Sequence, residues 1–398
     1  MIPADEALAL VLSKVITPIT ENIDIDEAVG RILKEDIVAD RDFPPFNRVM
    51  MDGIAINSRA WESGRREFYI EGIQTAGSPQ KTLSEEINCL EVMTGAMLPL
   101  NTDIVIRYED VQTDGNVARV TIDEVSALQN IHLKGTDRHV DEKLIDAHCT
   151  LSPAEIAVLA TVGKERLRVF EHLKIAIVST GDELVDVTAT PNPYQIRRSN
   201  SHALKAALKK IGHESTTYHV NDEKSEMLSQ LRSILEENDM VILSGGVSKG
   251  KKDFVPEILE QLQVEKLFHG VKQRPGKPFW FGYRESASPT AVFALPGNPV
   301  STFMCYYSYV QPWLNKCYGK EHAIVKATLT TDFEFSPQMT YFLQVKLSTN
   351  GSEVLATPIS GKGSGDLANL LEADAFMELP YDKQHFSAGE SYPIVSYR

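Results

Sequence analysis

The chain has 398 residues, which is too long for one ordinary domain, and its 42% hydrophobic and 24% charged residues are typical of a globular protein. A formal net charge of −15 argues against a general nucleic-acid binder. The four cysteines are widely spaced and form no Cys-x-x-Cys pair, which argues against a zinc site or a disulfide framework.

The first residues carry neither the basic segment nor the apolar core of a signal peptide. No apolar run along the chain is long enough to cross a bilayer. Together with the reducing environment that isolated cysteines suggest, these features predict a cytoplasmic protein that binds neither a membrane nor nucleic acid.

The N-terminal part is predicted to be helical and then irregular. Residues 3–15 have the apolar spacing of a helix, and a second short helix covers 25–30. Two adjacent prolines in 43–46 break the chain into a link. Asp52 and Gly53 follow as a turn where a strand is about to begin, and from this segment alone Asp52 is best explained as a turn former.

Short strands that alternate with turns predict a separate β domain over residues 68–121. Thr94 lies between two of these strands, and the local sequence favours an ordinary loop hydroxyl over a ligand contact. The expected strands are 68–70, 89–93, 103–108 and 116–121.

Helices and buried strands are predicted to alternate from residue 151 onward. A helix over 151–162 has Ser152 as its N-cap and Pro153 at its first position. The apolar run 173–178 is typical of a buried strand and ends in a polar loop, and a helix over 199–211 follows. This alternation predicts an α/β domain.

The stretch from 239 to 301 organises the predicted site. The apolar strand 239–243 is followed by a glycine-rich loop, 244–253, and by a helix over 254–260. A strand, a glycine loop and a helix N-terminus together direct backbone N–H groups at one point, which favours an anion. Two tight Pro-Gly turns follow at 274–278 and 295–301, and the first carries the cations Arg274 and Lys277.

The charge of this stretch also favours an anionic ligand. Between Ser244 and Arg284 there are eight Lys or Arg residues against four Asp or Glu residues, within an acidic chain. A solvated basic face is the alternative, and a lysine-rich loop alone would favour it. Three glycine or proline loops in one α/β unit instead favour a phosphate or oxyanion site.

Four carboxylates fall in loops at the expected ends of strands, where ligands bind in doubly wound sheets. Carboxylates beside a phosphate-binding loop suggest Mg²⁺, because this ion uses few protein oxygens and shares those of the ligand. Each residue alone is more often a helix cap or a solvated charge, so the prediction depends on the group. The predicted metal ligands are Asp182, Glu183, Asp222 and Asp253.

The C-terminal part is predicted to be an aromatic helix followed by a small β domain. The helix covers 301–314, and we interpret its rings as core or dimer packing. Five short strands with Gly and Pro turns then suggest a small barrel or sandwich, and the loop 361–366 is flexible enough to approach an anion. The strands are 323–329, 341–347, 354–358, 376–379 and 392–397.

Six motifs occur in a familiar order and spacing. They are Met51-Asp52-Gly53, Thr94-Gly95-Ala96, Ser179-Thr180-Gly181-Asp182-Glu183-Leu184, Ser244-Gly245-Gly246-Val247-Ser248, Pro275-Gly276-Lys277-Pro278 and Leu295-Pro296-Gly297-Asn298-Pro299-Val300-Ser301. Over essentially its whole length the chain resembles the molybdopterin molybdenumtransferase family, which includes bacterial MoeA proteins and the gephyrin E domain.

This resemblance implies insertion of molybdate into the dithiolene of adenylated molybdopterin, with release of AMP and a requirement for Mg²⁺. It also implies an elongated homodimer whose site lies between the α/β domain of one subunit and the inserted β domain of the other. Other proteins of molybdenum cofactor biosynthesis are further expected partners. The preference between molybdate and tungstate stays open.

The predicted site residues follow from the matching motifs and the glycine loop. The catalytic set is Asp52, Thr94, Glu183, Asp222, Asp253 and Lys277, with Asp52 and Thr94 supplied by the facing subunit. The set that binds substrate and cofactor is Gly245, Gly246, Ser248, Arg274, Pro296, Pro299 and Ser364.

The resemblance implies a multidomain α/β fold of four units. We expect a MoaB/MogA-like α/β domain with a largely parallel sheet, an inserted β domain, a small α+β linker domain and a C-terminal β-barrel-like domain. The expected boundaries are 1–46 with 131–170 for the linker, 47–130 for the inserted domain, 171–318 for the α/β domain and 319–398 for the barrel.

The sequence departs from the common family pattern without losing a predicted catalytic carboxylate, so we expect an active variant. The departures are Val49, Ile54, Thr136, Lys249 and Arg274, the last in place of a common lysine. Two alternatives remain at this point: an enzyme that adenylylates molybdopterin, which the α/β domain alone resembles, and a non-catalytic dimeric scaffold.

Overall fold

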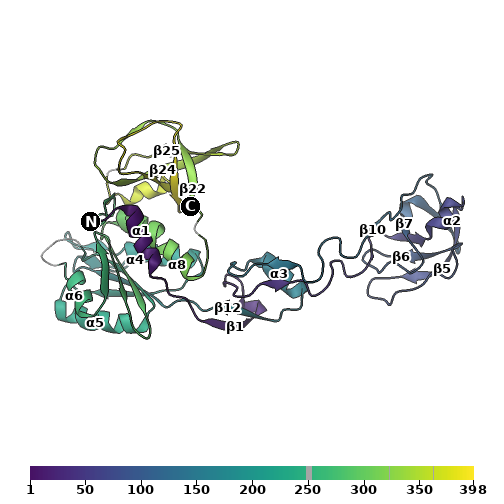
Figure 1. The fold of residues 1–398 in the computed structure, drawn as a ribbon, viewed down its shortest axis with the longest axis horizontal. Coiled ribbons are helices and arrows are strands. Elements are labelled where there is room, and N and C mark those ends of the chain that lie inside the picture. Colours follow the sequence, from purple (N-terminus) through teal and green to yellow (C-terminus); the bar gives the residue numbers. More distant parts are fainter. Residues whose placement is uncertain (248–252, 322, 362) are drawn as a thin grey trace.

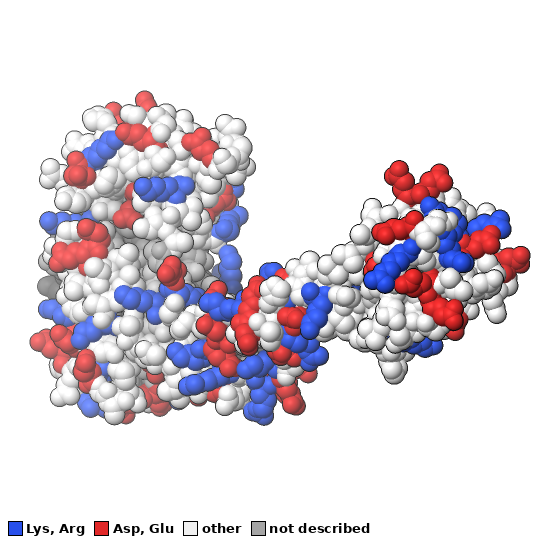
Figure 2. Space-filling model, turned by 45° about the vertical axis from the view of Figure 1, so that its right-hand side comes forward, with Lys and Arg blue, Asp and Glu red and all other residues white. Residues whose placement is uncertain are grey.

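The fold is elongated, with two units stacked at one end, a slender linker and a third unit at the far end (Figure 1). The computed structural model describes residues 1–247, 253–321, 323–361 and 363–398. Both signs of charge are interspersed on the face in Figure 2, which also shows the narrow waist between the stacked units and the inserted unit.

A mixed six-stranded sheet forms the centre of the α/β unit, in the order β16-β13-β17-β21-β20-β18. Strands β13, β17 and β21 are buried at every position, as the apolar runs predicted for parallel strands. The strands are β13 (Ile175–Thr180), β16 (Thr216–Val220), β17 (Met240–Ser244), β18 (Glu265–His269), β20 (Trp280–Arg284) and β21 (Thr290–Leu295), and the first three with β21 are parallel.

Helices cover both faces of this sheet, and alternate residues of each strand divide between two cores. Ile242 belongs to the core under α4, α7 and α8, whereas Leu243 belongs to the core under α5 and α6. The helices are α4 (Asn200–Lys210), α5 (Lys224–Glu237), α6 (Val255–Gln261), α7 (Pro299–Cys305) and α8 (Gln311–Cys317), with a π-helical segment η3 (Tyr306–Val310) between the last two.

The N-terminal helix α1 (Ala4–Ser13) forms where the sequence predicts it, but it packs in the core of the α/β unit. Ala7 and Val11 are fully buried there, and the Trp313 indole Nε1 donates a 2.7 Å hydrogen bond to the Lys14 carbonyl oxygen. The expected grouping of residues 1–46 with 131–170 therefore does not describe how α1 packs, because its apolar face is buried against α8.

The linker consists of two passes of the chain, one leading out to the inserted unit and one returning from it. The two passes pair with each other as short antiparallel strands. The pairs are β1 (Thr20–Asp24) with β12 (Arg166–Phe170), β2 (Ile37–Val38) with β11 (Lys143–Ile145), and β3 (Arg48–Val49) with β10 (Ile131–His132). Helix α3 (Pro153–Thr161) shares an apolar core with the first two of these pairs. The short helix expected over 25–30 is a single 3₁₀ turn, η1 (Ile25–Glu27).

The inserted unit is a six-stranded sheet in the order β7-β4-β6-β5-β9-β8. Its strands include those predicted, and β8 went unpredicted because three of its four residues are exposed and polar. The elements are β4 (Gly53–Ile56), α2 (Ser58–Glu62), β5 (Glu67–Gln74), β6 (Asn88–Val92), β7 (Ile104–Arg107), η2 (Tyr108–Asp110), β8 (Val111–Asp114) and β9 (Val117–Val120).

The C-terminal unit is a closed barrel, because β24 pairs with β25 on one side and with β26 on the other. Strand β19 (Gln273–Arg274) of the α/β unit adds to β24 in parallel and joins the two units. The barrel strands, all at the predicted positions, are β22 (Val325–Leu329), β24 (Thr340–Asn350), β25 (Glu353–Pro358), β26 (Ala375–Leu379) and β28 (Ser391–Ser396).

These units agree with the predicted multidomain α/β fold, while the residue boundaries between domains stay a prediction. Within the ranges that the structure describes, none of the helices combines the length and apolar character needed to cross a membrane. The cytoplasmic location also stays a prediction.

Helix α3 begins at the N-cap Ser152 that the sequence predicts, and Glu155 completes a capping box there. Ser152 Oγ accepts from the Ala154 N–H at 3.2 Å, and Glu155 Oε2 accepts from the Ser152 N–H at 2.8 Å. Ser152→Ala should destabilise the helix by about 1 kcal/mol, because it leaves an N-terminal N–H without its acceptor. Faster amide hydrogen exchange in α3 would show this.

Thr161→Ala is the matched control, since this hydroxyl bonds only back to the Ala157 carbonyl oxygen at the other end of the same helix. Equal exchange rates in Ser152→Ala and the unmodified protein would contradict the predicted role of the cap.

Candidate functional site

The carboxyl ends of the parallel strands surround a small cavity of about 250 Å³. Strand β13 ends at Thr180, β17 ends at Ser244, and the turn after β21 lies beside them. As the sequence predicts, the glycine loop and the polar loop after β13 meet here. The lining includes Gly181, Glu183, Asp222, Gly245, Gly246, Asp253, Pro296 and Gly297.

Gly245 and Gly246 are required by the close approach of the main chain. Their φ angles are +104° and +69°, and a Cβ on Gly245 would lie 2.9 Å from both the carbonyl and hydroxyl oxygens of Thr180. A Cβ on Gly246 would lie 2.7 Å from Val255 Cγ2 at the start of α6. A side chain at either position would therefore push the loop away from the strand ends.

Three carboxylates line the small cavity, and they are not equivalent. Glu183 folds back over Gly181, where a Cβ would lie 2.5 Å from Glu183 Oε2. Asp222 and Asp253 approach from the ends of β16 and of the glycine loop. All three would place oxygen atoms near a ligand bound at the strand ends.

The four predicted metal ligands do not form a preformed cluster. Asp182 Oδ1 accepts a 3.0 Å hydrogen bond from the Asp222 N–H, so it braces the neighbouring loop and is absent from the cavity lining. Among the described residues, no three His, Cys, Asp or Glu side chains converge in a way that could hold a metal ion. The bond to the Asp222 N–H gives Asp182 a structural contact, and its role as a metal ligand stays a prediction.

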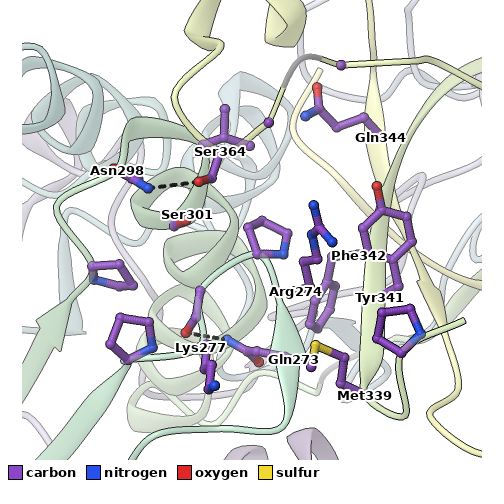
Figure 3. A pocket seen from close by; sticks show the side chains of 18 of the residues that line it. Gln273, Arg274, Lys277, Asn298, Ser301, Met339, Tyr341, Phe342, Gln344 and Ser364 are labelled. Carbon is purple, nitrogen blue, oxygen red and sulfur yellow. Dashed lines mark hydrogen bonds between the residues drawn. The ribbon is translucent and has the colours of Figure 1, made fainter. Parts of the chain in front are cut away.

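A larger cavity of about 740 Å³ lies between the α/β unit and the barrel, and it shares Pro278, Pro296 and Gly297 with the small one. Its α/β wall carries Arg274, Lys277, Asn298 and Ser301 (Figure 3). The barrel wall carries Met339, Tyr341, Phe342, Gln344, Ile359 and Ser364. One wall therefore offers cations and hydrogen-bond donors, and the other is mainly apolar and aromatic.

A single amide braces the loops at the strand ends. Asn200 is the first residue of α4, and its Nδ2 donates to Ser244 Oγ and to the Gly297 carbonyl oxygen, both at 2.8 Å. Thr302, which is buried in α7, donates its hydroxyl to the Pro296 carbonyl oxygen. These bonds hold the turns after β17 and β21 together.

Ser364 reaches the site from the barrel. Its Oγ accepts a 2.8 Å hydrogen bond from Asn298 Nδ2, and its carbonyl oxygen accepts one of 3.1 Å from the Val300 N–H (Figure 3). Pro299 begins α7 and does not line either cavity, so it shapes the helix start. Ser248 and Lys249 lie outside the described residues.

The barrel wall was missed by sequence reasoning. Tyr341 stacks on Phe335 with ring centroids 4.2 Å apart, and burial raises the pKa of Tyr341 while the Arg274 charge opposes that shift. In the sequence these residues look like ordinary alternating strand positions. The pairing of β19 with β24 brings these residues to the cavity. The two strands lie far apart in the sequence, so the sequence pattern does not reveal that pairing.

Asp52 and Thr94 meet in the inserted unit, as the motifs suggest. The Thr94 N–H and hydroxyl both donate to Asp52 Oδ1, at 2.6 and 2.8 Å. These two bonds lower the pKa of Asp52 below its usual value, with the backbone bond the larger cause. The inserted unit that carries this pair lies at the far end of the molecule from the α/β unit and the barrel, whose residues line the larger cavity (Figure 1).

Three family models match successive parts of the chain. Residues 2–163 match the MoeA N-terminal region (domain I and II), 176–316 match a probable molybdopterin binding domain, and 326–396 match the MoeA C-terminal region (domain IV).

Characterised sequences and solved structures agree with these matches. The molybdopterin molybdenumtransferase of Synechocystis sp. is 39% identical over 94% of both chains. That of Staphylococcus epidermidis is 32% identical over 99% of this chain and 95% of its own. The structure of the molybdopterin biosynthesis moeA protein from Pyrococcus horikoshii OT3 matches with a TM-score of 0.83 and 30% identity, over 100% of each chain.

The bonds to Asp52 predict a testable titration. A carboxylate whose pKa is lowered in the folded state adds stability above its unfolded pKa, and loses it as the pH falls through the folded value. Thr94→Val removes the hydroxyl donor, so the pKa of Asp52 should rise toward its usual value. The carboxyl carbon resonance of Asp52, followed by NMR against pH, measures this.

Thr94→Ser keeps the hydroxyl and should leave that titration nearly unchanged. If Thr94→Val titrates as the unmodified protein does, the side-chain bond does not hold the carboxylate in its ionised form.

Proposed function

Because the chain belongs to the MoeA family of molybdopterin molybdenumtransferases, which act in molybdenum cofactor biosynthesis, we propose that it inserts molybdate into adenylated molybdopterin and releases AMP. The observation that carries this reaction is the pair of adjoining cavities, with cations in one and carboxylates in the other. Both substrates are anionic, and one of them contains a phosphoanhydride. The arrangement offers a separate surface to each.

The cations of the larger cavity suit the anionic groups. Arg274 presents a planar fork that can donate two parallel hydrogen bonds to an oxyanion, and we assign it to molybdate. The Gly245 N–H already donates a 3.2 Å hydrogen bond to the Leu295 carbonyl oxygen, so we do not assign that amide to the oxyanion. Lys277 is a compact charge on a turn held by Pro275 and Pro278. When the phosphoanhydride breaks, AMP leaves with new charge on its phosphate oxygens, and Lys277 would stabilise that charge.

The small cavity fits Mg²⁺, although no cluster is preformed there. Mg²⁺ is usually held by one or two carboxylates together with substrate phosphate oxygens, and Glu183, Asp222 and Asp253 supply carboxylates around a cavity of about 250 Å³. When bound, the ion would neutralise the phosphoanhydride oxygens. Glu183 and Asp253 would orient the nucleotide through it.

Asp52 and Thr94 would complete the site in a homodimer. The inserted unit lies far from the α/β unit and the barrel of its own chain, which supports assigning these residues to the site of a second copy (Figure 1). Met50 and Met51, next to Asp52, are exposed in the single chain, as residues of a contact surface would be. Among the contacts of the residues that the structure describes, none favours an adenylylating enzyme or a scaffold over the transferase.

The reaction predicts that AMP release depends on molybdate and Mg²⁺ together. The measurement is AMP formed per active site from adenylated molybdopterin, with and without each ion. Asp253→Asn should slow the release by at least about a hundredfold, because it removes a carboxylate that would hold Mg²⁺ against the phosphoanhydride. Asp366→Asn, in the barrel loop and outside both cavity linings, is the control. If AMP release is the same with and without molybdate and Mg²⁺, and in Asp253→Asn, the protein is a hydrolase or a binding protein and not the proposed transferase.

A shared site predicts complementation between subunits. Asp52→Asn and Asp253→Asn should each be nearly inactive alone, whereas a mixed dimer holds one site with both carboxylates intact. Co-expressed subunits with two different affinity tags can be purified as the mixed dimer and assayed for AMP release. Mixed dimers that form and stay inactive would show that Asp52 does not serve the partner's cavity.

A further inference from the structure

A buried chain of hydrogen bonds lies beneath the turn that carries Arg274 and Lys277. Gln273 has no exposed surface, and its Nε2 donates to the Gly276 carbonyl oxygen at 3.1 Å. The same nitrogen lies 3.6 Å from Cys305 Sγ, and the Tyr309 hydroxyl donates to Gln273 Oε1. The amide is therefore bonded on both sides, as a buried polar group must be.

The direction of these bonds is fixed by the Gly276 carbonyl oxygen, which can only accept, so Gln273 Nε2 must face the turn. Gln273 Oε1 then faces the Tyr309 hydroxyl, which must donate to it, and burial keeps that hydroxyl protonated by raising the pKa of Tyr309 well above its usual value. The hydrogen bonds therefore all point the same way: the Tyr309 hydroxyl on the helix donates to the Gln273 amide, and that amide donates to the turn.

The helix that supplies Tyr309 changes type at this place. Residues 306–310 form the π-helical segment η3, and the Gln311 N–H bonds to the Tyr306 carbonyl oxygen, five residues back. Such segments are rare and are frequently found at functional sites. Here Cys305 and Tyr309, on either side of the change, both contact Gln273.

The turn itself is pressed against this helix. Gly276 has a φ of +90°, and a Cβ there would lie 2.8 Å from Cys305 Sγ and 2.9 Å from Met304 Cε. The Lys277 carbonyl oxygen accepts a 2.9 Å hydrogen bond from the Val271 N–H. Arg274 and Lys277 both line the larger cavity, and Figure 3 shows the Arg274 guanidinium pointing into it.

We propose that Gln273 and Tyr309 are positioning residues that set where Arg274 and Lys277 stand in the larger cavity. Tyr309 does not line that cavity. Gln273 borders the cavity, but it has no exposed surface and its amide is bonded to Tyr309 and to the turn, so both residues act through the turn. This inference rests on the proposed function, because it assumes that the two cations bind the anionic substrates.

The test compares Tyr309→Phe, Gln273→Met and the double variant. Molybdate alone is titrated into the dimeric protein by calorimetry, and kcat and KM for molybdate are measured in the AMP-release assay. Each single variant should weaken molybdate binding and raise KM by about tenfold, with kcat changed less, because small displacements of positioned groups have large effects. The double variant should be little worse than either single one, since both break one chain.

Two tyrosine controls separate positioning from stability. Tyr318→Phe removes a buried hydroxyl that accepts a 3.0 Å hydrogen bond from the Leu173 N–H, at the junction with the linker. It should lower Tm as Tyr309→Phe does without changing molybdate binding. Tyr306→Phe removes a hydroxyl that meets no hydrogen-bond partner within the described part of the chain, and should change neither quantity.

Each outcome decides the inference. A Tyr309→Phe protein with lower Tm but unchanged molybdate affinity and KM would show a purely structural role and overturn it. Fully additive effects in the double variant would also overturn it. If Gln273→Met does not fold, Tyr309→Phe against Tyr318→Phe still decides. An unmodified protein that neither binds molybdate nor releases AMP would overturn the proposed function instead.

Discussion

The structure depends on how closely the main chain packs at the carboxyl ends of β13, β17 and β21. A Cβ on Gly245 would lie 2.9 Å from Thr180, and one on Gly297 would lie 3.6 Å from Gly245 Cα, so the three turns meet with almost no side chain between them. Asn200 bonds to two of these turns and holds them in register. Main-chain atoms therefore meet where side chains would otherwise stand, and the Gly245 N–H donates a 3.2 Å hydrogen bond to the Leu295 carbonyl oxygen. The carboxylates of the small cavity and the cations of the larger one come from the loops around this contact.

The barrel is the second requirement, because it closes the larger cavity that the α/β unit leaves open. Strand β19 pairs with β24 for only two residues, yet it places Arg274 opposite Tyr341. Ser364 adds a contact on the far side of the cavity through Asn298. The cavity is thus defined by two small junctions, and the position of the turn between them depends on buried bonds rather than on surface ion pairs, which are weak and screened by salt.

Much of this fold is predictable from sequence because local signals decide it. The capping residue Ser152 predicts the start of a helix, and the apolar run of β17 predicts a buried strand. Each prediction needs only a few neighbouring residues. Strand β8 lacked such a signal, since its exposed polar residues pair only because β9 lies beside them. The site shows the same limit. The glycine loop predicted an anion site, but the sequence did not show that Asp182 turns toward the Asp222 backbone, nor that the aromatic helix becomes π-helical under Gln273. Those features depend on tertiary contacts between residues far apart in the chain.

Arg274 and Lys277 differ in how their charged groups bind anions. Both stand on one turn, but a guanidinium offers a rigid fork whose hydrogen bonds have fixed directions, whereas an ammonium is a compact charge that tolerates several geometries. An oxyanion that must be delivered in one orientation gains from the fork, and a leaving phosphate whose charge is spread over several oxygens gains from the ammonium. The fork is useful only if its base does not move. A buried amide without exposed surface beneath the turn meets that need, since breaking its bonds would leave polar atoms unpaired in the core. Arg274 and the hydrogen bonds beneath it therefore act together. The buried helix, through Tyr309 and Gln273, fixes the direction in which the guanidinium points at the cavity surface.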